Sequence, residues 1–143
     1  MVTTDELTSD IGHVEFHDGS LEAIRIEKDQ LLLSFAEVFA YREIGIEKFS
    51  IEKCRATLTI MGPREIKLMG SLGQHAWVAD CDLTGSDGSN LSRNLLSGTG
   101  EGKLNLSLDN GMTVEAGFRR AVLELHGPLE PFETWDGPLV SDN

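Results

Sequence analysis

The sequence predicts a mainly β fold, an antiparallel sandwich or barrel-like sheet of about eight strands with at most a short helical turn. Several runs alternate apolar and polar residues with a period of two, which is typical of strands with one buried face. Turn residues separate these runs about every ten positions, as expected for short antiparallel strands. No regular alternation of strands with long helical patterns is present, so a parallel α/β sheet is disfavoured.

The clearest element is a hairpin near the middle of the second half. Residues 103–108 alternate polar side chains with leucines, and residues 112–118 alternate apolar side chains with polar ones or glycine. The intervening Asp109-Asn110-Gly111 contains residues that tolerate the positive φ angles of tight hairpin turns. We therefore expect two paired strands with their apolar faces in the core.

A second hairpin is predicted upstream, where residues 21–27 and 31–35 flank the turn Lys28-Asp29-Gln30. The continuation, residues 35–43, has features of both helix and strand. Its alanines and Glu37 favour helix, whereas Phe39 and Tyr41 share one parity and favour a strand, which we predict. Further strands are predicted at residues 51–61, 65–71, 75–82 and 120–126.

The length of 143 residues predicts a single domain spanning 1–143. We expect residues 1–11 to be frayed. Residues 127–143 are predicted to form an irregular tail packing on the core, because Gly127-Pro128 and Pro131 interrupt regular structure. Phe132 and Trp135 in this tail would cover the protein's own core, or alternatively fill a pocket of a partner. Residues 83–102 are predicted to form a long loop.

The charge balance limits the classes of partner. With 24 acidic and 12 basic residues, the formal net charge is -12, which disfavours nucleic acid and anionic membranes as ligands. Solubility alone would explain this charge, and a basic partner is the alternative. The first residues lack the features of a signal peptide, and Cys54 and Cys81 form no Cys-x-x-Cys pair. These features predict a cytoplasmic protein with two buried thiols.

One cluster suggests metal binding. On a strand, His13, Glu15 and His17 would project from the same face, and imidazole and carboxylate groups are ligands for zinc or iron. However, strand residues four apart are separated by about 13 Å, which is too far for both histidines to reach one ion on a straight strand. The alternative is a solvated polar face, and we predict no cofactor.

Other motifs are incomplete. Residues 80–86 match the opening oxygens and the glycine of a calcium-binding loop, but Leu91 stands where a bidentate glutamate is required. The sequence contains no Gly-x-Ser-x-Gly or His-Glu-x-x-His motif. We therefore predict that the protein is not an enzyme.

Residues 16–21, Phe-His-Asp-Gly-Ser-Leu, are followed by Ile24, Ile26 and the apolar run of residues 31–35. This opening resembles that of small bacterial β-rich domains of the toxin-immunity-protein type, in which His-Asp precedes a first hairpin. Residues 135–137, Trp-Asp-Gly, resemble a Trp-x-Gly found in such proteins. The resemblance implies a non-enzymatic binding protein, and it transfers no catalytic or binding residue.

Three functions are considered. The first is an acidic binding protein, of the immunity or inhibitor type, for a basic protein partner, with His17, Asp18, Phe132 and Trp135 as candidate contacts. The second is a carrier of a small apolar ligand in a β-barrel pocket. The third is a metal-dependent enzyme that uses His13, Glu15, His17 or His75. Exposed edge strands would also permit a homodimer.

Overall fold

The structure, a computed structural model, describes residues 11–74, 76–92 and 95–137, which form eight β-strands and no α-helix. All strand pairings are antiparallel, in one sheet of order β4-β7-β6-β5-β1-β2-β3-β8. The predicted mainly β, antiparallel fold class is therefore confirmed. The strands are β1 (Ile11–Glu27), β2 (Gln30–Gly45), β3 (Lys48–Met61), β4 (Arg64–Met69), β5 (Ala76–Gly85), β6 (Gly102–Leu108), β7 (Thr113–Phe118) and β8 (Arg120–Asp136).

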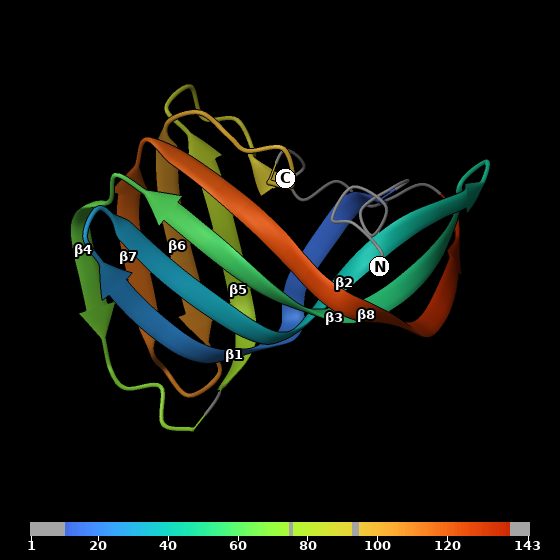
Figure 1. Cartoon of the computed structure of the whole chain (residues 1–143), viewed down its shortest axis with the longest axis horizontal. Helices are drawn as coiled ribbons and strands as arrows, with labels where there is room; N and C mark the ends of the chain where they lie inside the picture. Colours follow the sequence, from blue (N-terminus) through green and yellow to red (C-terminus); the bar gives the residue numbers. More distant parts are fainter. Residues whose placement is uncertain (1–10, 75, 93–94, 138–143) are drawn as a thin grey trace.

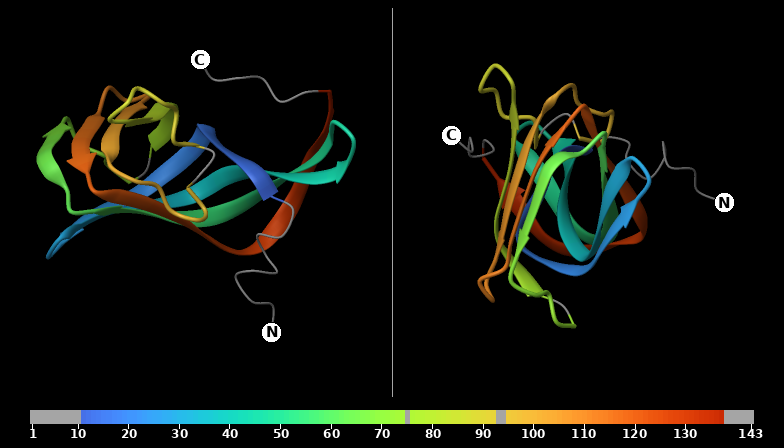
Figure 2. Two further views of the ribbon diagram at one scale, coloured as in Figure 1. Left: turned by 90° about the horizontal axis from the view of Figure 1, so that it is seen from above. Right: turned by 90° about the vertical axis from the view of Figure 1, so that its left-hand side faces the viewer.

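The sheet folds over itself at one end. Its two halves, β1-β2-β3-β8 and β4-β7-β6-β5, are joined through β1 and β5, where Ser20 pairs with Trp77 and Leu21 with Ala76 among the residues with described positions. The shorter strands face one end of the longer ones, and the other end of the longer strands projects beyond them (Figure 1; Figure 2, left). The molecule thus has a two-layered part and a projecting part.

The core fills the space between the two layers. The predicted hairpin of residues 103–118 is confirmed as β6 and β7, with Leu104, Leu106, Val114 and Phe118 at most 1% exposed. Asn110 accepts a hydrogen bond from the backbone of Met112 and stabilises the turn. Side-chain alternation on these strands therefore directs one apolar row into the interior.

The ambiguous segment, residues 35–43, is confirmed as strand and belongs to β2. Leu33 and Phe35 are buried before a register shift between Phe35 and Val38, whereas Val38 and Ala40 are buried after it. The buried parity therefore changes from odd to even. This change explains the mixed periodicity of the segment, and it places Phe39 and Tyr41 on the face opposite the core.

The predicted irregular tail after His126 is wrong over most of its length, because β8 continues to Asp136. Gly127, Pro128 and Leu129 lie opposite Cys54 alone, between the pairs of Arg55 with His126 and Lys53 with Glu130. Proline lacks the N–H that a central strand donates, but an edge strand with a bulge tolerates it. The predicted frayed segment, apart from Ile11, and positions 138–143 of the tail lie outside the described residues.

The exposed edge of β8 is partly covered by the segment before β6. Thr99 donates its backbone N–H to the carbonyl of Ala121, and Leu123 donates to the carbonyl of Leu95. Leu95 is 1% exposed, so this segment also contributes to the core. At the opposite edge of the sheet, Met69 of β4 is 65% exposed. Dimerisation through edge strands stays a prediction.

Candidate functional site

A large bulge interrupts β1 at the Phe-His-Asp-Gly sequence. Residues 16–19 lie opposite Val38 alone, between the pairs of Glu15 with Phe39 and Ser20 with Glu37. Asp18 adopts a φ of 66°, a left-handed conformation that aspartate tolerates better than most residues. A Cβ atom at position 19 would overlap the carbonyl oxygen of Glu37, so only glycine fits there. The bulge is therefore encoded by Asp18 and Gly19.

The bulge turns His17 and Asp18 outward, with side chains 60% and 80% exposed. His17 donates from Nδ1 to the carbonyl oxygen of Ala79 in β5 at 2.7 Å, and its Nε2 lies 3.7 Å from the Asp18 carboxylate. The imidazole thus links β1 to β5 near the point where the two strands separate.

A second bulge lies in β8. Glu133 pairs with Ile51 and Pro131 pairs with Glu52, so Phe132 is an extra residue without its own partner in β3. Such a bulge breaks the strict alternation of side chains. Phe132 and Glu133 consequently line the same hollow, although they are adjacent in the chain.

The two bulges flank a hollow that we call the bulge cleft. Its floor comes from Phe39 and Tyr41 of β2 and Ile51 of β3, and the rings of Phe39 and Phe132 are 5.3 Å apart. The cleft has a volume of about 470 Å³. Its complete lining is Glu15, His17, Asp18, Phe39, Tyr41, Ile51, Phe132 and Glu133.

A second hollow, of about 580 Å³, adjoins the bulge cleft because both include Glu15 and His17. We call the two hollows together the acidic groove. No lysine or arginine is among the described residues that line it, and five of those residues are acidic: Glu15, Asp18, Asp80, Asp82 and Glu133. The second hollow is lined by Glu15, His17, Asp80, Cys81, Asp82, Asn90 and Ser92.

One carboxylate of the groove has a buried partner. His13 is 7% exposed, its Nε2 lies 3.2 Å from Glu15, and its ring packs edge-on against Tyr41. Because a carboxylate accepts hydrogen bonds, this nitrogen carries the proton. The hydrogen bond from His13, together with the charges of His13 and His17, holds the pKa of Glu15 below its ordinary value despite partial burial.

Of the three predicted metal ligands, only His13 and Glu15 contact each other. The further candidate His75 lies outside the described residues. His13 and Glu15 form a pair, but His17 directs one ring nitrogen to the backbone of Ala79. In the part of the chain that the structure describes, no group of three or more His, Cys, Asp and Glu residues is placed to hold a metal ion. Residues 80–86, which resemble part of a calcium loop, mostly belong to β5.

The cysteines are both free, Cys54 buried and Cys81 half-buried. Burial raises the pKa of the Cys54 thiol to about 11, and Glu52 adds to this effect. Burial raises the pKa of the Cys81 thiol well above its ordinary value, and the negative charges of Asp82 and Asp80 raise it further. Both thiols are therefore poor nucleophiles at neutral pH.

Of the four predicted partner contacts, His17, Asp18 and Phe132 meet in the bulge cleft. Trp135 lies further along β8, opposite Phe49, and is not part of the cleft lining. The sequence analysis missed Glu133 as a site residue. Its place in the cleft follows from the bulge at Phe132, which is defined by the pairing of β8 with β3 and is not visible in the local sequence pattern.

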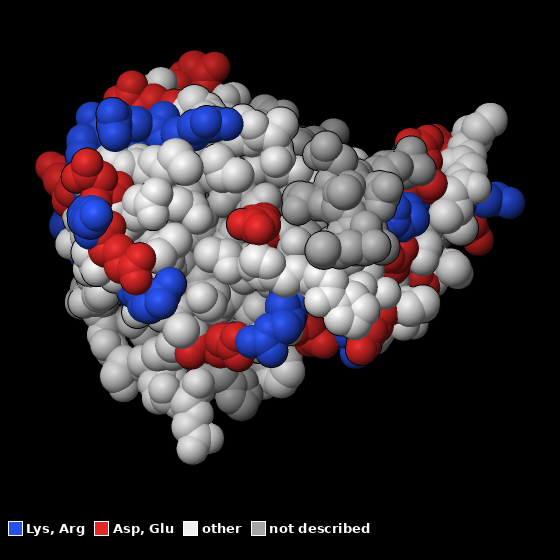
Figure 3. Space-filling view, in the orientation of Figure 1, with Lys and Arg blue, Asp and Glu red and all other residues white. Residues whose placement is uncertain are grey.

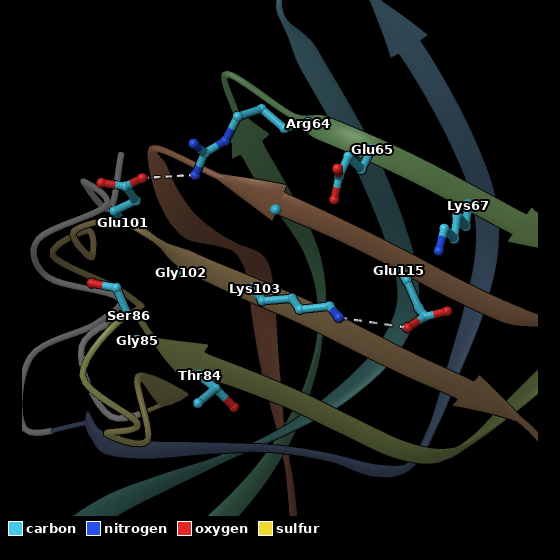
Figure 4. Close-up of a pocket in the computed structure, with 11 residues that line it drawn as sticks. Arg64, Glu65, Lys67, Thr84, Gly85, Ser86, Glu101, Gly102, Lys103 and Glu115 are labelled. Carbon is cyan, nitrogen blue, oxygen red and sulfur yellow. Dashed lines mark hydrogen bonds and ion pairs between the residues drawn. The ribbon is translucent and has the colours of Figure 1, made fainter.

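Charged residues elsewhere are mixed in sign. On the face shown in Figure 3, acidic and basic side chains lie near one another at the left, in the lower middle and at the right, with uncharged side chains between these groups. A third hollow, of about 270 Å³, is lined by residues of β4, β5, β6 and β7 (Figure 4). Arg64 pairs there with Glu101 at 2.7 Å, and Lys103 lies 3.9 Å from Glu115. The charged side chains of this hollow are therefore of both signs, whereas those of the acidic groove are carboxylates.

Comparisons with known proteins identify no relative. No family model matches the chain, and no curated protein and no solved structure is significantly similar to it. Within the described residues, no helix has the length and apolar character needed to span a membrane.

Proposed function

We propose that this protein is a non-enzymatic binding protein whose acidic groove receives a basic protein partner. The observation that carries the proposal is the convergence of two bulges on one hollow. They place Asp18 and Glu133 beside Glu15, and Asp80 and Asp82 continue the acidic lining. β1 and β8 are separated in the sheet by β2 and β3, so the hollow brings together carboxylates from strands that are not neighbours.

The electrostatics of the whole chain support the same proposal. A net charge of -12 attracts a basic protein over long distances, and a groove of one sign strengthens this field locally. Such attraction increases association rates and selects against acidic partners. The aromatic floor adds apolar area, which is typical of the centre of a protein interface.

An inhibitor or immunity role is the specific form of the proposal. It is supported by the resemblance of residues 16–21 to toxin-immunity-type domains. In the present chain, residues 16–19 of this segment form the bulge described above. A cytoplasmic location is part of this proposal, since such inhibitors act inside the cell.

The carrier hypothesis has less support. It requires an open interior, yet the central side chains of both layers are at most 2% exposed and belong to one packed cluster. The aromatic residues that line a hollow are on the projecting part and are accompanied by carboxylates, which suit an apolar ligand poorly. The buried central residues are Leu33, Phe35, Leu58, Leu106, Val114 and Leu123.

Affinity capture tests the proposal. The immobilised chain is incubated with an extract of the source cells at low salt, and bound proteins are quantified by mass spectrometry. We expect a protein of net positive charge that binds the native chain and not an Asp18→Lys/Glu133→Lys variant. The matched control is Glu65→Lys/Glu124→Lys, which changes the net charge equally outside the groove. Capture of no protein, or equal capture by both variants, contradicts the proposal.

A further inference from the structure

We infer that the bulge cleft binds the guanidinium group of an arginine side chain presented by the partner. This inference rests on the proposed function and specifies its chemistry. The cleft combines two features, a floor of aromatic rings and a border of carboxylates. Together they favour a flat cation over a neutral or an anionic group.

The aromatic rings provide the first part of the recognition. Phe39, Tyr41 and Phe132 line the cleft, and a guanidinium group stacks on such rings through cation–π attraction. The protein already contains one example on the same ring, because Nζ of Lys53 lies 4.7 Å from the centre of Phe132. Lys53 is also 3.5 Å from Glu37 and is not part of the cleft lining.

The carboxylates provide the second part. Asp18 and Glu15 reach the cleft from β1, and Glu133 reaches it from β8. The guanidinium group has five N–H donors in a planar fork, so it contacts a carboxylate through two hydrogen bonds while its face stays on a ring. A lysine ammonium group lacks this planar arrangement and is more strongly hydrated.

Alternative occupants fit less well. An apolar ligand would remove water from Asp18, Glu133 and Glu15 without replacing their hydrogen bonds. A metal ion would need a third close ligand, and no such group is placed for it among the residues with described positions. The volume of about 470 Å³ accommodates a whole arginine side chain and part of its backbone.

The test is an NMR titration of the full ¹⁵N-labelled chain with Nα-acetyl-arginine amide. The parallel probe is Nα-acetyl-citrulline amide, which has nearly the same shape without the charge, and the lysine analogue is a third probe. We expect the arginine probe to shift the amide resonances of the cleft residues and to bind at least about threefold more tightly than the lysine probe. The citrulline probe should cause no saturable shift.

Two variants locate the site. Phe132→Leu and Glu133→Gln should each weaken binding of the arginine probe by at least about threefold, whereas Glu124→Gln on the outer face should leave it unchanged. Shifts confined to other residues, or equal binding of arginine and citrulline, would overturn the inference. The comparison of probes uses the native chain, so it stays decisive even if a variant does not fold.

The outcomes of the two experiments are distinguishable. If Asp18→Lys/Glu133→Lys abolishes capture of a basic protein but the arginine probe does not bind the cleft, the inference fails and the proposed function stands. If the arginine probe binds the cleft but no basic protein is captured, the proposed function fails and the guanidinium site stands.

Discussion

Asp18 and Glu133 line the same hollow although they belong to β1 and β8, which are separated in the sheet by β2 and β3. Each residue lies in or beside a bulge, and each bulge occurs where the sequence departs from regular strand character. Asp18 has a left-handed backbone, and Glu133 follows the unpaired Phe132. The candidate site therefore depends on local irregularities in otherwise regular strands.

The close packing at Gly19 predicts a large effect of a single methyl group. Gly19→Ala should destabilise the protein by about 1–3 kcal/mol, because the new Cβ would overlap the Glu37 carbonyl and lie 2.9 Å from that of Phe16. The measurement is the free energy of unfolding in urea. Gly12→Ala is the control on the same strand, since nothing lies within 4 Å of its Cβ. Equal stabilities of the two variants would argue against the bulge.

The core between the layers predicts a second difference. Leu106→Ala should lower the free energy of unfolding by about 2–5 kcal/mol, because Leu106 is 1% exposed within the central cluster. Leu68→Ala on edge strand β4 should change it by less than about 1 kcal/mol, since Leu68 is 42% exposed. If both changes cost the same free energy in urea unfolding, the assignment of the buried face is wrong.

Alternation of side chains was sufficient to predict the central hairpin, because β6 and β7 keep one parity buried throughout. It was insufficient for β2 and β8. In β2 the buried parity changes after Phe35, and in β8 three residues lie opposite Cys54. These shifts depend on the partner strand, which a local pattern does not contain.

The same reasoning explains the outcome for the site. His17, Asp18 and Phe132 line one cleft, and their contact with a partner stays a prediction. Pro128 and Pro131 indicated an irregular tail, but the edge position of β8 accommodates them. Glu133 was missed because its place in the cleft follows from the bulge at Phe132, which only the pairing with β3 reveals.

The pair of His13 and Glu15 predicts a pH effect on stability. Because the folded protein holds the pKa of Glu15 below its ordinary value, the unfolded chain binds this proton more readily. The stability that Glu15 contributes is therefore fully present above the ordinary pKa of 4.5 and is lost as the pH falls through the lower folded value.

Titration of the Glu15 side-chain carbon resonance by NMR measures this pKa directly. The midpoint should lie below 4.5 in the native chain and should rise in His13→Leu, because burial then acts without the hydrogen bond and charge of His13. Identical midpoints in the two proteins would show that His13 is not the cause.

The thiols should be almost unreactive in the folded protein. At pH 8, a pKa of about 11 leaves Cys54 roughly 100-fold less thiolate than a thiol at the ordinary 9.0. Cys81 should also react slowly with iodoacetamide, and Asp82→Asn should accelerate it because one negative neighbour is removed. Alkylation is followed by mass spectrometry with Glu65→Gln as the control. Native Cys81 that reacts as fast as in urea contradicts this account.

The most direct measurement of the central claim is the association rate of the purified captured partner as a function of ionic strength. If the acidic groove attracts a basic surface, the rate for the native chain should fall steeply with added salt. Asp18→Asn/Glu133→Gln should lower both the rate at low salt and the slope, and Glu65→Gln/Glu124→Gln should change both much less. A native rate that is independent of salt, or equal slopes for the two double variants, would contradict a role for the groove in binding.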